Sequence, residues 1–295
     1  MQTTPQITAH FSQPRTLTRG VLLAFASCAA FAFADACVKL IEGALPPYQI
    51  AFFGALFSLA AVPLLLQPGE RWSAAFSARH PSLWLLRAVA WAMAVLGSVT
   101  AFTHLSMAEA FAVIFLQPAF VTVMSILFLK ERVEGRHWAA IIVGFIGVLV
   151  VLRPGFRELS VGHLGAVLAG LGGAISIVAF RAAGPSESKA SLFCAGAFGV
   201  MAVCGSMMLA DYSTPSAKVW LLLAGYGLLV GAGNLLMIHA TAHAPAAYVG
   251  PTQYSQMIWA IALGYWLFDD GVDTPMLIGI ALIIAAGLFN LPRRA

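Results

Sequence analysis

The chain has 295 residues, of which 60% are hydrophobic and only 9% are charged. A soluble domain of this length needs more polar surface than this composition supplies, so the composition excludes a soluble globular protein and indicates one embedded in a bilayer. The formal net charge of +4 reflects basic residues gathered on one side of the membrane. It gives no reason to expect a nucleic-acid partner.

Residues 1–18 are polar and lack an apolar core, so we expect a disordered cytoplasmic tail rather than a signal peptide. The apolar run that follows contains Ala32-Phe33-Ala34, which resembles a cleavage site. The first span is needed to keep the internal repeat even, and we therefore expect it to be retained as a membrane helix.

Apolar segments of about 18 to 24 residues, long enough to cross a hydrocarbon core as helices, recur along the rest of the chain with short polar breaks between them. We expect an all-α membrane protein whose ten transmembrane helices cover residues 19–41, 47–66, 82–104, 108–129, 135–152, 161–181, 189–210, 217–240, 245–267 and 273–291. These spans use nearly the whole length. No soluble catalytic domain remains, and we predict that the protein is not an enzyme.

Two stretches of the chain repeat each other with their loop charges exchanged. The first runs from Ala108-Glu109-Ala110 to a basic loop that starts at Lys130, and the second runs from Ala244-Pro245-Ala246 to an acidic loop that starts at Asp269. Loops rich in Lys and Arg stay cytoplasmic, so a unit read twice with opposite loop charge is inserted in opposite orientations. We therefore predict two inverted five-helix repeats, residues 19–152 and 161–291, which is the construction of a transporter.

The basic residues also predict the orientation of the chain. With the N-terminus inside, the outer side holds Lys39, Arg153, Arg157 and Lys218, whereas the inner side holds Arg15, Arg19, Arg71, Arg79, Lys130, Arg132, Arg136, Arg181, Lys189, Arg293 and Arg294. By the positive-inside rule both termini are then cytoplasmic. The expected location is a bacterial inner membrane.

Five short motifs, in this order and spacing, resemble the EamA-type half of the drug/metabolite transporter superfamily: Leu45-Pro46-Pro47, Ala108-Glu109-Ala110, Gln117-Pro118, Leu129-Lys130-Glu131-Arg132 and Gly144-Phe145-Ile146-Gly147. The similarity covers essentially the whole chain and is strongest to bacterial amino acid exporters, including the aromatic amino acid exporter. Family members often carry an Arg in the second span about seven residues after the Pro pair. Gly54 stands there, so no substrate contact is carried over to that position.

The ninth span carries a polar face. At 100° per residue, Tyr248, Thr252, Ser255, Gln256 and Trp259 share about a third of the helix circumference, with Gln253 just beyond and Gln117 as its counterpart in the fourth span. Most of the corresponding face of the fourth span is apolar. We expect these residues to line a cavity for an amphipathic small molecule such as an amino acid with a hydrophobic side chain. The alternative is that the polar groups bind neighbouring helices.

Other spans supply single candidates. Trp91 lies near mid-depth, where interfacial aromatic belts do not reach, and Asn234 shares a face with two glycines, so both are candidate cavity residues with helix packing as the alternative. Arg87 lies about one turn inside the third span. It is expected to extend to the interface, with contact to a substrate carboxylate as the alternative.

Three further charged residues are candidates for gating or coupling. Asp35 and Lys39 are four residues apart in the order that favours a helical ion pair, so we expect them to pair. The alternatives are proton uptake by Asp35 or substrate binding by Lys39. Glu109 is expected to be a solvated acid that the helix N-terminus stabilises, with a gating role as the alternative.

Other classes of protein fit less well. The four cysteines lie inside spans without metal-binding spacing, and His239 and His243 have no carboxylate nearby, so we expect neither a metal site nor a cofactor. Asp269-Asp270-Gly271-Val272-Asp273 matches the carboxylate pattern of membrane prenyltransferases, but the second acidic cluster of those enzymes is missing. A passive channel would not need an inverted repeat.

The sequence thus predicts a secondary transporter that exports amino acids or similar small amphipathic metabolites by alternating access. Export of cationic drugs or of other metabolites is the alternative. A small-molecule substrate and the lipid bilayer are the expected partners, and the predicted plan is compatible with a monomer.

Overall fold

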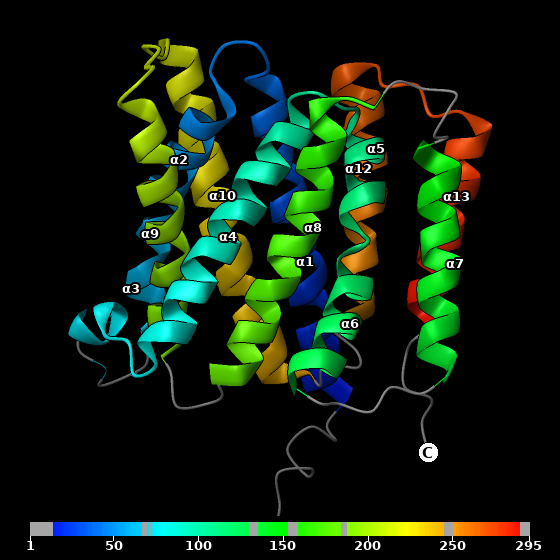
Figure 1. Cartoon of the computed structure of the whole chain (residues 1–295), viewed down its shortest axis with the longest axis horizontal. Coiled ribbons are helices and arrows are strands. Elements are labelled where there is room, and N and C mark those ends of the chain that lie inside the picture. The colour runs from blue at the N-terminus through cyan, green and yellow to red at the C-terminus, as the bar shows by residue number, and fades with distance from the viewer. Residues whose placement is uncertain are drawn as a thin grey trace, which may run out of the picture.

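The computed structural model describes residues 14–66, 70, 72–129, 135–152, 159–183, 188–244 and 250–289. Within these residues all regular secondary structure is helical (Figure 1). The elements are α1 (Pro14–Leu40), α2 (Pro47–Ser58), η2 (Leu59–Ala61), α3 (Val62–Leu65), η3 (Trp72–Phe76), α4 (Pro81–Phe102), α5 (Met107–Ile114), α6 (Gln117–Leu129), α7 (Gly135–Leu152), α8 (Val161–Ala183), α9 (Lys189–Met208), α10 (Ala217–His243), η5 (Gly250–Tyr254), α12 (Ser255–Phe268) and α13 (Thr274–Phe289).

Seven helical stretches in the described residues are long and apolar enough to cross a membrane: Leu17–Leu40, Pro47–Leu65, Pro81–Phe102, Met107–Phe128, Val161–Ala179, Lys189–Met208 and Ala217–His243. Shorter apolar helices occupy Ile141–Val151 and Thr274–Ala286. These findings confirm an all-helical membrane protein in the described part of the chain. That ten helices cross the bilayer, and that both termini are cytoplasmic, stay predictions.

Several helix boundaries differ from those expected. The helix α1 begins at Pro14, so the last residues of the predicted tail are helical, and residues 1–13 lie outside the described part. The predicted fourth span is not one continuous helix, because α5 ends at Ile114 and α6 starts at Gln117. Pro118 explains the break, since proline has no N–H for the helix before it but fits the first turn of a new one.

The predicted ninth span begins, in its described part, with the 3-10 turn η5, which leads directly into α12. This segment and the interrupted fourth span are the two that the sequence pairs as repeats. Each contains a proline at its change of helical geometry, Pro118 in the first half and Pro251 in the second.

Close helix packing relies on glycine. The helix α4 packs mainly on α8 and then on α9, while α10 packs mainly on α1 and then on α2. At the α4–α8 contact, a Cβ added to Gly97 would lie 2.6 Å from the carbonyl oxygen of Gly165, and one added to Gly165 would lie 2.7 Å from that of Gly97. Such reciprocal backbone contacts require residues without a side chain.

The helices α7 and α13 stand side by side at one edge of the bundle (Figure 1). Their contact is also reciprocal, because a Cβ on Gly147 would lie 2.8 Å from the Gly279 carbonyl oxygen and a Cβ on Gly279 would lie 2.6 Å from that of Gly147.

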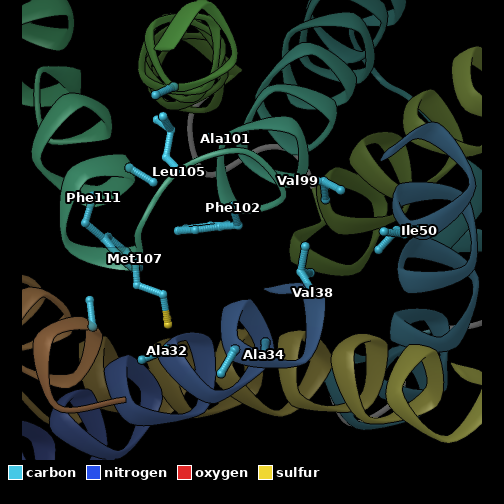
Figure 2. Packing of buried hydrophobic residues seen from close by; sticks show 14 of the residues in the cluster. Ala32, Ala34, Val38, Ile50, Val99, Ala101, Phe102, Leu105, Met107 and Phe111 are labelled. Carbon is cyan, nitrogen blue, oxygen red and sulfur yellow. The ribbon is translucent and has the colours of Figure 1, made fainter. Parts of the chain in front are cut away.

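The largest buried cluster includes the meeting point of α1, α4 and α5, shown in Figure 2. There the rings of Phe102 and Phe111 lie 5.1 Å apart between centroids. Met107 extends toward Ala32 of α1 in the same view. Charged residues lie next to this apolar contact, since Lys39 and Asp270 bond to the backbone at Leu105 and Met107.

Candidate functional site

The predicted Asp35–Lys39 ion pair is wrong. The Lys39 ammonium instead contacts both carboxylate oxygens of Asp270, at 2.9 and 3.2 Å, and the carbonyl oxygen of Leu105 at 3.1 Å. A helical pair four residues apart contributes only about 0.2–0.5 kcal/mol. Lys39 is only 7% exposed. Charge-assisted hydrogen bonds in such desolvated surroundings are stronger than a helical pair of this kind.

Asp270 also joins the two halves of the chain. Its carboxylate accepts a hydrogen bond from the backbone N–H of Met107 at 3.2 Å, and Phe268 lies 5.1 Å from the Lys39 ammonium. The cluster therefore connects the last turn of α1, the start of α5 and the residues after α12. Because Lys39 is committed to it, we do not carry Lys39 forward as a ligand for a substrate carboxylate.

Asp35 lies on the same helix but in different surroundings. Its carboxylate interacts with the side chain of Gln256 from α12 and lies within electrostatic range of Tyr226 from α10 and of Cys37. Asp35 and Gln256 both keep part of their surface accessible inside the bundle. Among the described residues, the salt bridges do not include Asp35. A carboxylate, an amide and an aromatic side chain thus converge from three helices.

Tyr226 also explains a departure from the family motif. A Cβ at Gly54 would collide with the Tyr226 ring, which is only 6% exposed. The space that an Arg side chain would need in the second span is therefore filled by an aromatic ring from the second half of the chain.

Among the described residues of the predicted face on the ninth span, Gln256 is the one that contacts Asp35. Thr252 and Ser255 are buried against Cys28 of α1, and the Ser255 hydroxyl donates to the Thr252 carbonyl oxygen at 2.6 Å. These two residues are placed as helix contacts. The 3-10 turn η5 changes the angular spacing of residues 250–254. The predicted face assumed 100° per residue throughout and therefore grouped residues that face different neighbours.

The other residues of that span lie elsewhere. Gln253 is exposed, and Trp259 is 36% exposed with its ring 5.9 Å from that of Phe33, itself 43% exposed. Tyr248 lies outside the described residues. Gln117 packs its amide against Gly173 of α8, at 2.8 Å from the place that a Cβ would occupy.

Arg87 points between helices instead of toward the membrane interface. Its guanidinium donates to the Leu192 carbonyl oxygen at 2.7 Å and to the Ser176 hydroxyl at 2.8 Å, which ties α4 to α9 and α8. It also lies 5.7 Å from the ring of Trp91, which packs on Gly196. Trp91 therefore occupies a helix interface, as the packing alternative for it predicted.

Asn234 bonds within its own helix. Its amide donates to the Val230 carbonyl oxygen at 2.9 Å, and α10 runs through this position without a break. Its neighbours Gly227 and Gly231 contact the backbone of α2 at Gly54 and Ser58. Helix packing is the role that these contacts support for both glycines.

Glu109 is buried, which makes the expectation of a solvated acid wrong. It is 8% exposed, and its carboxylate lies 3.2 Å from Nε2 of His163. The backbone N–H of Ser160 donates to Nδ1 of the same ring at 2.9 Å. With Nδ1 as an acceptor, Nε2 is the ring nitrogen that faces the Glu109 carboxylate as a donor. The cause of the burial is the packing of α5 against α8.

An apolar pocket lies beside the α5–α6 break, between α6, α7, η5 and α13. The rings of Phe115 at that break and of Tyr254 in η5 stack 5.5 Å apart between centroids. The pocket is lined by Phe115, Leu116, Pro118, Ala119, Ile141, Gly144, Phe145, Tyr254, Ile283 and Ala286. Leu116 and Ala119 belong to the face of the fourth span that the sequence analysis described as apolar.

The sequence analysis missed His163, Tyr226 and the pairing of Asp270. These residues meet their partners across long stretches of chain, and no local pattern indicates such contacts. Within the described residues, no group of three or more His, Cys, Asp or Glu side chains is arranged to hold a metal ion.

Comparison with known proteins gives the setting of this site. The model of the EamA-like transporter family matches residues 18–153 and again residues 160–291. The pseudopaline exporter CntI of Pseudomonas aeruginosa is 27% identical over 276 residues, which cover 92% of this chain and 95% of that protein. A S-adenosylmethionine uptake transporter of Rickettsia felis is 24% identical over 265 residues, covering 86% of each chain. A crystal structure with 17% identity shares the fold, with a TM-score of 0.62 over 94% of this chain and 96% of that one.

Proposed function

The chain belongs to the EamA-like transporter family, and we propose that it exports amino acids or similar small amphipathic metabolites across the bacterial inner membrane by alternating access. The family assignment confirms the resemblance that the short motifs indicated. It also makes the protein a membrane transporter and not an enzyme, since its relatives are transporters.

The observation that carries alternating access is the matched packing of the two halves. If residues 19–152 and 161–291 are inverted repeats, α4 corresponds to α10 and α8 corresponds to α1. The main contact of α4, with α8, is then equivalent to the main contact of α10, with α1. The secondary contacts, α4 with α9 and α10 with α2, correspond in the same way. Interchangeable halves supply inward-open and outward-open states of similar energy.

The chemistry around Asp35 supports a small amphipathic substrate. Asp35 and Gln256 supply polar contacts from two helices, while the pocket at Phe115 and Tyr254 is apolar. A substrate with a charged end and an apolar end matches both surfaces. The carboxylate of Asp35 also favours the second candidate, export of cationic drugs. A carboxylate attracts a cationic substrate whether or not that substrate carries a carboxylate of its own.

Flux in proteoliposomes tests this function. We expect uptake of radiolabelled amino acids with hydrophobic side chains to saturate with concentration and to accelerate when the same unlabelled amino acid is present on the opposite side. Flux without saturation or acceleration would point to a channel and contradict the carrier. Transport of lipophilic cations alone, with no amino acid flux, would replace the amino acid assignment with the second candidate.

A further inference from the structure

We propose that Asp35 binds the ammonium group of the substrate, with Gln256 and Tyr226 completing the site. As a transport site this rests on the proposed function, whereas cation binding at Asp35 can be measured without flux. The relevant juxtaposition is a carboxylate from α1, an amide from α12 and an aromatic ring from α10, so both halves of the chain contribute.

Lys39 does not serve as the counter-ion of Asp35. Lys39, one turn away, is held by Asp270 and the Leu105 carbonyl oxygen. The carboxylate of Asp35 thus lies inside the bundle without a salt bridge to any described residue. An isolated charge in such surroundings is costly, and acids within membrane spans usually face a cavity and meet a mobile partner.

Asp35 also remains accessible. Asp35 is flanked on α1 by Ala34 and Ala36, both buried, yet Asp35 itself keeps accessible surface, and so does Gln256. Within a packed bundle, surface retained by two interacting polar side chains leaves them able to meet a small ligand.

These side chains also favour an ammonium group. A carboxylate accepts charge-assisted hydrogen bonds from an ammonium group, and the Gln256 amide can donate to the carboxylate while its carbonyl oxygen accepts from the ligand. The Tyr226 side chain lies within electrostatic range of the Asp35 carboxylate and adds a third group beside the proposed ammonium position. Hydrogen bonds to charged groups correspond to roughly tenfold to hundredfold in affinity.

Three related ligands with the same phenylethyl skeleton separate the contributions of the two charged groups. Phenylalanine has both charges, phenethylamine keeps only the ammonium, and N-acetylphenylalanine keeps only the carboxylate. We expect the wild-type protein to bind phenethylamine at least about tenfold more tightly than N-acetylphenylalanine in calorimetric titrations of the detergent-solubilised transporter. Asp35→Asn should abolish this preference, and Asp35→Glu should keep most of it.

The matched control is Glu42→Gln, which neutralises an exposed acid just beyond the same helix. It should leave the preference intact, and gel filtration should show that each variant remains folded. Unchanged discrimination in folded Asp35→Asn would overturn the proposal. The proposal would also be overturned if Asp35→Asn lost pH-gradient-driven uptake but kept the preference for phenethylamine, because Asp35 would then serve proton coupling. If the protein showed no amino acid flux but still bound phenethylamine with a preference that depends on Asp35, the proposed function would be wrong. The ammonium site at Asp35 would nevertheless be supported.

Discussion

Single contacts between distant residues decide the chemistry of this protein. Lys39 contacts Asp270 rather than Asp35, and the Asp35 carboxylate is left with the Gln256 amide as its hydrogen-bonding neighbour. The Glu109–His163 contact lies between α5 and α8 in the same manner. Sequence spacing suggested neither pair, because local patterns describe neighbours along one helix and these partners come from different helices.

At this scale we predict that Asp270→Asn destabilises the protein by about 3 kcal/mol, because it leaves the buried Lys39 ammonium without its counter-charge. Thermal unfolding in detergent, followed by circular dichroism, measures the effect as a lower Tm. Asp269→Asn is the control, since Asp269 is exposed and Asn tolerates its left-handed backbone with φ of 53°. Equal Tm values for the two variants would show that the cluster contributes nothing to stability.

Helices form where the sequence has apolar segments long enough to cross a bilayer. Whether such a helix is continuous also depends on the prolines within the segment. The predicted segments 108–129 and 245–267 both contain apolar runs, yet α5 and α6 are separate and η5 precedes α12. The prolines at these positions, Pro118 and Pro251, are visible in the sequence. Their effect on the register is not, so the helical wheel grouped Thr252 with Gln256 although the two face different partners.

The seam between α7 and α13 gives a test at the level of elements. Gly147→Ala places a methyl group 2.8 Å from the Gly279 carbonyl oxygen, which is too close without backbone movement. Overpacking of this kind costs about 1–3 kcal/mol, and Gly279→Ala should act similarly. Gly144→Ala on the same helix is the control, because its nearest neighbour would be 3.6 Å away. Similar thermal stability of Gly147→Ala and Gly144→Ala would contradict the close contact.

For the whole molecule, the predicted orientation has both termini in the cytoplasm. Glu42→Cys, at an exposed position after α1, should then react with a membrane-impermeant maleimide in intact cells. Lys189→Cys, exposed at the start of α9, should react only after permeabilisation. The four native cysteines are buried or half-buried, so their background labelling should be low. Reversed labelling of the two positions would invert the assigned topology.

The glycine seams have a consequence for how such a molecule can rearrange. Where backbones touch at Gly97 and Gly165, no free volume remains for sliding, and Arg87 adds hydrogen bonds from α4 to α8 and α9. Ser27 similarly bonds α1 to the Gly233 carbonyl oxygen of α10. Each of these tied groups of helices therefore combines both halves of the chain. If the transporter rearranges by rigid-body movement, we expect these mixed groups to move as units and the hinges to lie between them.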